Sequence, residues 1–391
     1  MNESTSKNFD SVTFPSLEQL RARGTLKWTA YPADVLPLWV AESDPDTCPA
    51  VAHAVAEACK REHFGYPPRD ISALTEAAAG FSELRYGWRP NPDNIFAIAD
   101  VVRGVTLAVE RFTRPDSAIV VPTPAYMPFF DVGPALGRES VFIPTLADGP
   151  DLDALEDAFK DGAGCLILCN PNNPLGFTYT AEKLREITDL AARYGARVIS
   201  DEIHGPVVLT GKHTPTASVS DTADEVTITV TATSKGWNTA GLKCAQLILN
   251  NADAKEWNAL PHIVHEGVSI LGLVAAAAAW RDGVPWLDRF LDVLRGNRDT
   301  IAARLAEFAP EAKFTPPQAS FLGWIDLTGV PGIDTGNPSQ WLVDNARIAL
   351  NPGTAFGEGG SGHVRMNFAT SPEILGEALD RFEAAIAASR G

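Results

Sequence analysis

The sequence predicts an α/β protein with a mostly parallel sheet in a large domain and a smaller α+β domain. From about residue 94 to residue 250, short apolar segments alternate with amphipathic helical segments, which is the pattern of βαβ units. After residue 285 the pattern changes to one long helical segment, two strand-like segments and a final helical segment. We therefore expect a large domain over residues 46–285 and a small domain over residues 1–45 and 286–391.

Each expected strand is a short run of apolar and β-branched residues. In the large domain these runs are Ile95–Ala99, Ala118–Val121, Val141–Pro144, Cys165–Cys169, Arg197–Ser200, Val226–Thr231 and Ala245–Leu249. The segment Ala181–Tyr194 is amphipathic and follows Thr180, a residue type that caps helix N-termini. In the small domain we expect helices over Trp286–Phe308 and Pro372–Ala388 and strands over Phe321–Asp326 and His363–Phe368.

The composition is that of an acidic globular protein. With 391 residues, 45% of them hydrophobic, the chain can bury a large core. Its net charge of −17 argues against nucleic-acid or anionic-membrane binding, because both require a basic surface. No apolar run reaches the length of a membrane span, and Met1–Val12 lacks the apolar core of a signal peptide. We expect a cytoplasmic protein that binds neither nucleic acid nor membranes.

Three patterns that could suggest other chemistry have simpler explanations. Gly357–Gly362 matches G-x-G-x-x-G, but a strand-like segment follows it instead of a helix, which favours a plain loop. His262 and His265 lie beside Glu266 without a third ligand, so we expect no metal site. The cysteines are odd in number and most lie in apolar segments, which favours buried free thiols over a disulfide framework.

Polar residues follow three of the expected strands. Asn173, Asp201 and Lys235 each lie just after a strand, and ligands of parallel sheets bind at the carboxyl ends of the strands. A lysine presented there can form a Schiff base with an aldehyde. Taken singly, Lys235 could be a surface charge, Asn173 a turn residue and Asp201 a helix cap. Together, in this order, they favour a catalytic site.

The chemistry of these residues suits a pyridine aldehyde cofactor. A carboxylate such as Asp201 can keep the ring nitrogen protonated, so that the ring acts as an electron sink. Asn173 and His204 can bond the ring hydroxyl. Tyr126 and Ile203 can pack on the two faces of the ring.

A phosphate group on that cofactor would need its own binding site. Backbone N–H groups at a helix N-terminus bind phosphate, and we expect a helix over Thr106–Phe112 that is opened by Arg103, Gly104 and Val105. The hydroxyls of Thr233 and Ser234 and the charge of Lys243 lie near Lys235 in the sequence. We therefore expect the phosphate ligands to be Arg103, Gly104, Val105, Thr233, Ser234 and Lys243.

These residues make the chain resemble the fold-type I, aspartate-aminotransferase-like pyridoxal-phosphate enzymes over nearly its whole length. Within that superfamily it is most similar to the MalY/PatB-type cystathionine β-lyases, also called C–S lyases. The stretches that carry the resemblance are Lys27-Trp28, Leu36–Glu42, Phe64-Gly65-Tyr66, Ser200–His204, Ser234-Lys235 and Trp237–Lys243.

The resemblance implies roles for individual residues. Lys235 would bond pyridoxal 5′-phosphate in the large domain, Asp201 would pair with its ring nitrogen and Asn173 with its ring hydroxyl. Arg365 would bind the substrate carboxylate together with Asn173, and Ala41 would line the substrate site.

The resemblance also implies an assembly and a reaction. Tyr66 would reach the cofactor phosphate of a neighbouring subunit and its substrate, which implies a homodimer. The reaction would cleave L-cystathionine or related cysteine S-conjugates into a thiol, pyruvate and ammonia, with Lys235 or Tyr126 protonating the leaving sulfur. A class I/II aminotransferase would use the same residues, so that alternative stays open. The sequence departs from the pattern at Lys243, where relatives commonly have arginine, and over Glu42–Pro45 near the substrate entrance.

Overall fold

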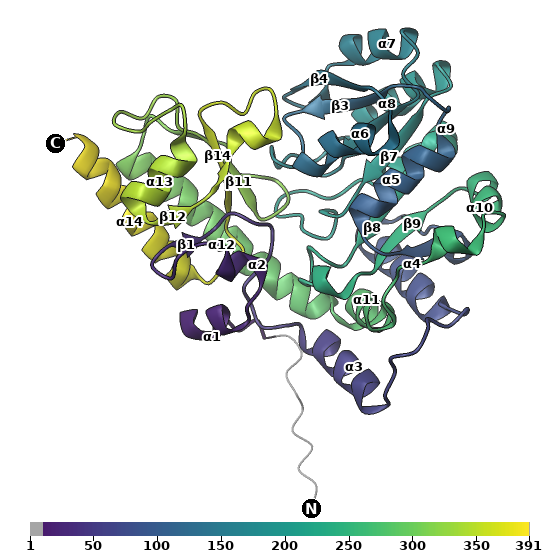
Figure 1. Cartoon of the computed structure of the whole chain (residues 1–391), viewed down its shortest axis with the longest axis horizontal. Helices are drawn as coiled ribbons and strands as arrows, with labels where there is room; N and C mark the ends of the chain where they lie inside the picture. The colour runs from purple at the N-terminus through teal and green to yellow at the C-terminus, as the bar shows by residue number, and fades with distance from the viewer. Residues whose placement is uncertain (1–10, 391) are drawn as a thin grey trace, which may run out of the picture.

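The computed structural model describes residues 11–390 and shows one large sheet, two small sheets and the helices around them (Figure 1). The large sheet has the order β2-β9-β8-β7-β6-β3-β4-β5. Its strands are β2 (Ile95–Ile98), β3 (Ile119–Thr123), β4 (Ser140–Leu146), β5 (Gly149–Pro150), β6 (Cys165–Cys169), β7 (Arg197–Asp201), β8 (Thr227–Ala232) and β9 (Ala245–Ile248). The central pairs from β4 through β8 are parallel, whereas β2, β5 and β9 pair antiparallel. The predicted α/β class is confirmed.

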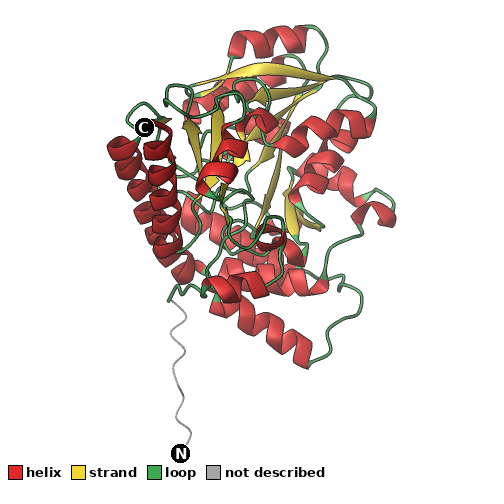
Figure 2. Ribbon diagram, turned by 60° about the vertical axis from the view of Figure 1, so that its left-hand side comes forward, coloured by secondary structure: helices red, strands yellow, loops and turns green. Residues whose placement is uncertain are grey.

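Helices cover both faces of the large sheet, as Figure 2 shows. Side chains of β6 alternate between two cores, with Cys165 and Ile167 facing α5 and Leu166 and Leu168 facing the other layer. The elements of this part are α3 (Pro49–Lys60), α4 (Ser72–Tyr86), α5 (Val101–Phe112), α6 (Val132–Leu136), α7 (Leu152–Lys160), α8 (Ala181–Arg193), α9 (Asp221–Val226), α10 (Asn251–Asn258) and α11 (Ile270–Asp282). Burial on both faces explains why the strands are continuous apolar runs.

The C-terminal part forms a second, antiparallel sheet with the order β10-β11-β14-β13. Its elements are α12 (Val284–Phe308), β10 (Lys313–Phe314), β11 (Leu322–Asp326), α13 (Pro338–Ala346), β12 (Ile348–Ala349), β13 (Asn351–Pro352), β14 (His363–Asn367) and α14 (Pro372–Arg390). The predicted long helix, two strands and final helix all occur, with ends that differ by a few residues.

The N-terminal segment packs against this C-terminal part. It contains α1 (Leu17–Ala22), α2 (Leu26–Thr29) and β1 (Leu36–Pro37), and β1 pairs in parallel with β12. Figure 1 shows these purple elements beside the yellow end of the chain. The division into domains at residues 45 and 285 stays a prediction.

The minor sequence patterns have clear structural counterparts. Gly357–Gly362 is a loop that leads into β14, as expected. His262 and His265 are the first and last residues of a short 3-10 helix, and His262 pairs with Glu266 through atoms 3.0 Å apart. Among residues 11–390 no group of His, Cys, Asp and Glu could hold a metal ion, and no helix is long and apolar enough to cross a membrane. All five cysteines are free, and Cys59 alone is exposed.

The predicted start of the helix that follows β2 was wrong. Helix α5 begins at Val101, not at Thr106, because Asp100 caps it: its carboxylate accepts a hydrogen bond from the N–H of Arg103 at 2.8 Å. Gly104 therefore lies inside the helix, where it faces β2 and β8. A Cβ atom there would lie 2.3 Å from Ile98 Cδ1 and 2.7 Å from Val230 Cγ1. Gly104 allows close packing of the helix on the sheet.

We predict that Gly104→Ala lowers the free energy of unfolding by about 1–3 kcal/mol, because the added methyl group overpacks this contact. Gly296→Ala is the matched control, since Gly296 also lies inside a helix but has nothing within 4 Å of its Cβ position. That variant should be more stable by about 0.5–1 kcal/mol. Urea unfolding of both variants checks the prediction, and equal effects would contradict it.

Candidate active site

The carboxyl edge of the large sheet borders a cavity of about 360 Å³. It brings together residues that follow β3, β6, β7 and β8 with the start of α5. Of the residues predicted to form a site, the cavity wall contains Ala41, Tyr126, Asn173, Asp201, Ile203, His204, Ser234, Lys235 and Lys243. The convergence expected from a parallel sheet is therefore observed.

Lys235 lies three residues beyond the end of β8 and points into the cavity. Its Nζ donates a hydrogen bond to the main-chain oxygen of Ala41 at 2.8 Å. Burial and the nearby charge of Arg365 lower the pKa of Lys235 to about 8, against the opposing effect of Asp201. A minority of the amine is therefore neutral near neutral pH, a much larger share than in an ordinary lysine, and this neutral form is the one that acts as a nucleophile or general base.

Asp201 is the last residue of β7, and only 2% of its surface is exposed. Its Oδ1 accepts a hydrogen bond from the N–H of Ile203 at 3.0 Å. Burial raises the pKa of Asp201 to about 7, although this bond and the charge of Lys235 oppose the rise. A cationic ring nitrogen in the cavity would stabilise the carboxylate form.

Arg365, on β14, is a buried cation. Its Nη1 donates to Asn173 Oδ1 at 3.1 Å and its Nη2 to the oxygen of Trp39 at 3.2 Å. The guanidinium carbon lies 4.7 Å from the ring centre of Phe356. Within residues 11–390 its Nε has no hydrogen-bond partner, and its guanidinium forms no ion pair with a carboxylate. This site has the capacity to bind an anion.

Three further residues define the walls of the cavity. Tyr126 and Ile203 come from loops after different strands and both line it. His204 is buried, its Nδ1 has no partner among the described residues, and burial lowers the pKa of its imidazole well below the ordinary range. The ring of His204 is therefore neutral, and its Nδ1 is a polar atom that the described residues leave unused.

The start of α5 forms one end of the cavity. Asp100, Val101 and Val102 line it together with Ser234 and Thr239. Lys243 also lines the cavity, and its Nζ is 2.9 Å from Asp100 Oδ2. Helix N-terminal N–H groups, hydroxyls and a lysine form a suitable set of ligands for a phosphate.

Six predicted site residues lie outside the cavity wall, and one of them, Arg365, is hydrogen-bonded to Asn173 of the wall. Arg103 is exposed, whereas Gly104 and Val105 lie on the buried face of α5. Thr233 Oγ1 is hydrogen-bonded to Thr239 Oγ1 at 2.7 Å. Tyr66 is 92% exposed and borders a separate hollow beside Arg69, Phe96 and Trp257. The phosphate contacts predicted for Arg103, Gly104, Val105 and Thr233 therefore have no geometric support, whereas the role predicted for Tyr66 concerns a second subunit and stays a prediction.

Sequence reasoning missed two kinds of site residue. Asp100 and Thr239 line the cavity although no role was assigned to them. The main-chain oxygen of Trp39 accepts a hydrogen bond from Arg365, although Trp39 was predicted only as part of the Leu36–Glu42 stretch that carries the resemblance. The N-cap pattern at Asp100 was the available signal for the first, since Asp is a preferred residue there. Main-chain contacts leave no signal of this kind.

The cavity provides contacts for each group of a pyridine aldehyde that carries a phosphate. Lys235 offers an amine to the aldehyde, and buried Asp201 offers a carboxylate to the ring nitrogen. The unpaired Nδ1 of His204 and the donor set around α5 provide polar contacts for the remaining groups. The residues present therefore fit such a cofactor.

Comparison with known proteins agrees with this chemistry. Residues 33–382 match the family described as aminotransferase class I and II. The chain is 50% identical to a cystathionine β-lyase of Corynebacterium glutamicum over 95% of this chain and 99% of that protein. It is 34% identical to the cystathionine β-lyase PatB of Bacillus subtilis, over 90% and 93% of the two chains.

The fold is also found among solved structures. A protein of Corynebacterium diphtheriae, described as a pyridoxal-phosphate-dependent β-cystathionase, matches with a TM-score of 0.93 and 49% identity. The match covers 96% of this chain and 99% of that one. The likeness therefore extends over nearly the whole chain.

We predict that Asp201→Asn changes how stability depends on pH in the cofactor-free chain. The folded carboxyl has a pKa of about 7 against 3.8 for its ordinary value, so the folded state holds the extra proton between these limits. Unfolding free energy of the wild type should therefore fall as pH rises from about 4 to 7, on the order of 2 kcal/mol or more, relative to the variant. Urea unfolding at a series of pH values measures this, and parallel curves would contradict it.

Proposed function

The chain belongs to the aminotransferase class I and II family, and on that premise we propose that its cavity binds pyridoxal 5′-phosphate and that it cleaves L-cystathionine. It is a pyridoxal-phosphate-dependent carbon–sulfur lyase, in agreement with its high identity to cystathionine β-lyases. The reaction consumes water and yields homocysteine, pyruvate and ammonia. Related cysteine S-conjugates would release other thiols by the same reaction.

The observation that carries the proposal is the buried, unpaired Arg365. A cation that is removed from water without a carboxylate partner is unfavourable unless a ligand supplies the anion. The α-carboxylate of an amino acid has the shape for a two-point contact with a guanidinium. Asn173, already bonded to Arg365, is placed to bind the same carboxylate.

The cofactor would be held by residues on the cavity wall. Asp201 would pair with the ring nitrogen, Asn173 and His204 would bond the ring hydroxyl, and Tyr126 and Ile203 would contact the two faces. The phosphate would lie at the start of α5 near Ser234, Thr239 and Lys243. When bound, pyridoxal phosphate supplies an electron sink for the charge that remains at Cα after its proton leaves.

Lys235 moves the proton in this proposal. Its lowered pKa leaves part of the amine neutral, so that Nζ can accept the Cα proton of the bound amino acid. Arg365 and Asn173 orient the Cα–H bond by fixing the carboxylate. Loss of the thiolate from Cβ then completes the elimination.

The leaving sulfur needs a proton. Burial and the charge of Asp201 raise the pKa of Tyr126, so its hydroxyl stays protonated at neutral pH. Tyr126 and the protonated Lys235 both border the cavity and can each supply that proton. The site residues serve an aminotransferase equally well, and what favours the lyase is the identity to lyases.

The proposed enzyme is a cytoplasmic homodimer. Tyr66, Phe64 and Ile263 are 92%, 63% and 80% exposed, which is unusual for large apolar side chains and favours a partner surface. In a dimer Tyr66 would reach the cofactor phosphate and the substrate of the second subunit. Five free cysteines suit a reducing compartment.

We predict that Lys235→Ala abolishes pyruvate release from L-cystathionine, because no other amine on the described cavity wall except the Asp100-paired Lys243 could take the proton. The assay contains no keto acid, so an aminotransferase would not turn over in it. Wild-type protein should release pyruvate and thiol in equal amounts. Turnover by the variant near the wild-type rate would refute the role of Lys235.

We predict that Arg365→Lys raises the KM for L-cystathionine by about tenfold or more, since the lysine keeps the charge but loses the two-point contact. Absorbance of the bound cofactor should not change. Arg304→Lys is the matched control, because Arg304 pairs with Asp380 and Glu383 on the surface. Surface pairs contribute about 0–1 kcal/mol, so its kinetics should stay those of the wild type. Unchanged kcat/KM for Arg365→Lys would remove Arg365 from the site.

A further inference from the structure

Residues 39–43 form an irregular segment whose consecutive main-chain oxygens all accept hydrogen bonds from side chains of other parts of the chain. The donors are Arg365 and Asn351 to Trp39, Asn367 to Val40, Lys235 to Ala41, Lys27 and Asn367 to Glu42, and Asn238 to Ser43. The segment is neither helix nor strand, so these side chains take the place of a regular ladder. Two of them, Lys235 and Arg365, belong to the proposed active site.

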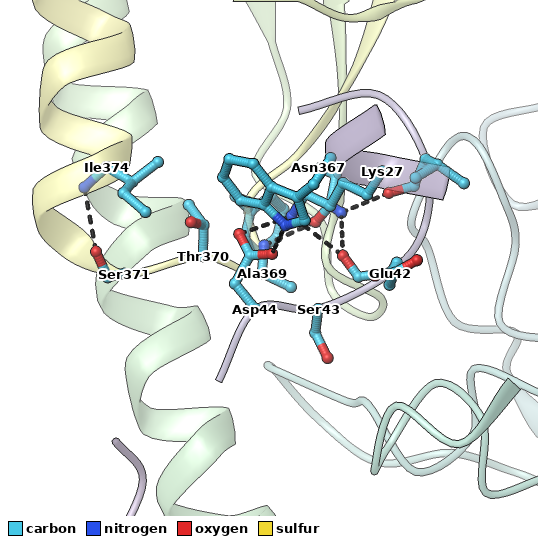
Figure 3. Close-up of polar contacts among 12 residues, drawn as sticks. Lys27, Glu42, Ser43, Asp44, Asn367, Ala369, Thr370, Ser371 and Ile374 are labelled. Carbon is cyan, nitrogen blue, oxygen red and sulfur yellow. Dashed lines mark hydrogen bonds and ion pairs between the residues drawn. The ribbon is translucent and has the colours of Figure 1, made fainter. Parts of the chain in front are cut away.

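The 39–43 segment is anchored at its end by a buried ion pair. Lys27 Nζ lies 2.7 Å from Asp44 Oδ2, and the side chains are 0% and 1% exposed. Trp28 Nε1 donates to the other carboxylate oxygen at 3.1 Å, and the N–H of Asp44 donates to the oxygen of Ala369. Figure 3 shows this cluster beside Asn367. A shift of the segment at this end would break the ion pair and leave a buried charge without a partner, which is unfavourable.

Asn238 connects the 39–43 segment to the turn that carries Lys235. Its Nδ2 donates to the oxygen of Ser43 at 2.8 Å, and its Oδ1 accepts from the N–H of Ser43 at 3.1 Å. The amide thus makes the same two-point contact as a paired strand. Asn238 has φ of 54°, a left-handed conformation that asparagine adopts more readily than most residues. The residue type suits both the backbone and the contact.

We propose that Asn238 is a positioning residue that couples the Lys235 turn to the 39–43 segment. Through this contact the oxygen of Ala41 is held against the Lys235 amine while the oxygen of Trp39 is held against Arg365. One rigid segment thereby sets the distance between the group that moves the Cα proton and the group that binds the carboxylate. This inference rests on the proposed function.

The test is Asn238→Ser in the cofactor-loaded enzyme, with Asn250→Ser as matched control. Asn250 is also partly buried, and its Nδ2 likewise donates to the main chain, to the oxygens of Asp224 and Glu225. It lies near the start of β8, whereas Lys235 follows the end of that strand. Serine can still cap α10 in the control.

Asn238→Ser should lower kcat about tenfold, raise KM for L-cystathionine, and speed hydrogen–deuterium exchange of the peptide that contains residues 39–43. A tenfold loss corresponds to about 1.4 kcal/mol. Cofactor affinity, measured by absorbance titration, should stay within about threefold of the wild type, since Asn238 is not on the cavity wall. The control should show wild-type kinetics and wild-type exchange in this peptide.

Several outcomes would overturn the proposal. These are unchanged exchange over residues 39–43 in Asn238→Ser, faster exchange with unchanged kcat and KM, or an equal loss of kcat in Asn250→Ser. If Asn238→Ser does not fold, Asn238→Asp carries the same test, because it keeps the acceptor for Ser43 N–H and loses the donor. Absence of lyase turnover in the wild type would instead refute the proposed function, while the exchange comparison would remain valid.

Discussion

Two cations and one carboxylate, the half-buried Lys235 and the buried Arg365 and Asp201, lie at or beside one cavity, and the surrounding elements hold them there without ion pairs. Lys235, Arg365 and Asp201 bond to neutral main-chain or amide groups, not to each other. Burial without ion pairing shifts all three pKa values toward the uncharged forms. The arrangement is unfavourable for stability but leaves each charge available to a ligand.

Such a site requires a scaffold that does not relax around it. The large sheet provides one side, because adjacent parallel strands β6, β7 and β8 end beside one another with their side chains packed in two cores. The second sheet provides the other side through Arg365 on β14. Between them the 39–43 segment is held by side chains of both parts, which lets an irregular loop act as a rigid element.

The end of the cavity near α5 shows how one position can serve two needs. Asp100 caps the helix and also pairs with Lys243, the cation nearest the proposed phosphate site. Burial opposes ionisation of Asp100, but the N–H of Arg103 and the Lys243 ammonium lower its pKa overall. A phosphate that binds there must share Lys243 with this carboxylate, a difference from a site in which an arginine provides a bidentate contact.

The α/β class, the approximate positions of the main strands along the chain and the places of Asn173, Asp201 and Lys235 after strands could be predicted from the sequence, since apolar runs and their periodicity are local properties of the chain. Tertiary packing decided that Gly104 serves the contact of α5 with the sheet, whereas the start of α5 at Val101 follows from the local cap at Asp100. It also decided that Ala41 lies against Lys235, 194 residues away, and that Arg365 bonds Asn173, 192 residues away. The resemblance grouped these residues in one site, but the hydrogen bonds themselves depend on how distant elements pack, and a main-chain acceptor such as the oxygen of Ala41 carries no residue-specific signal.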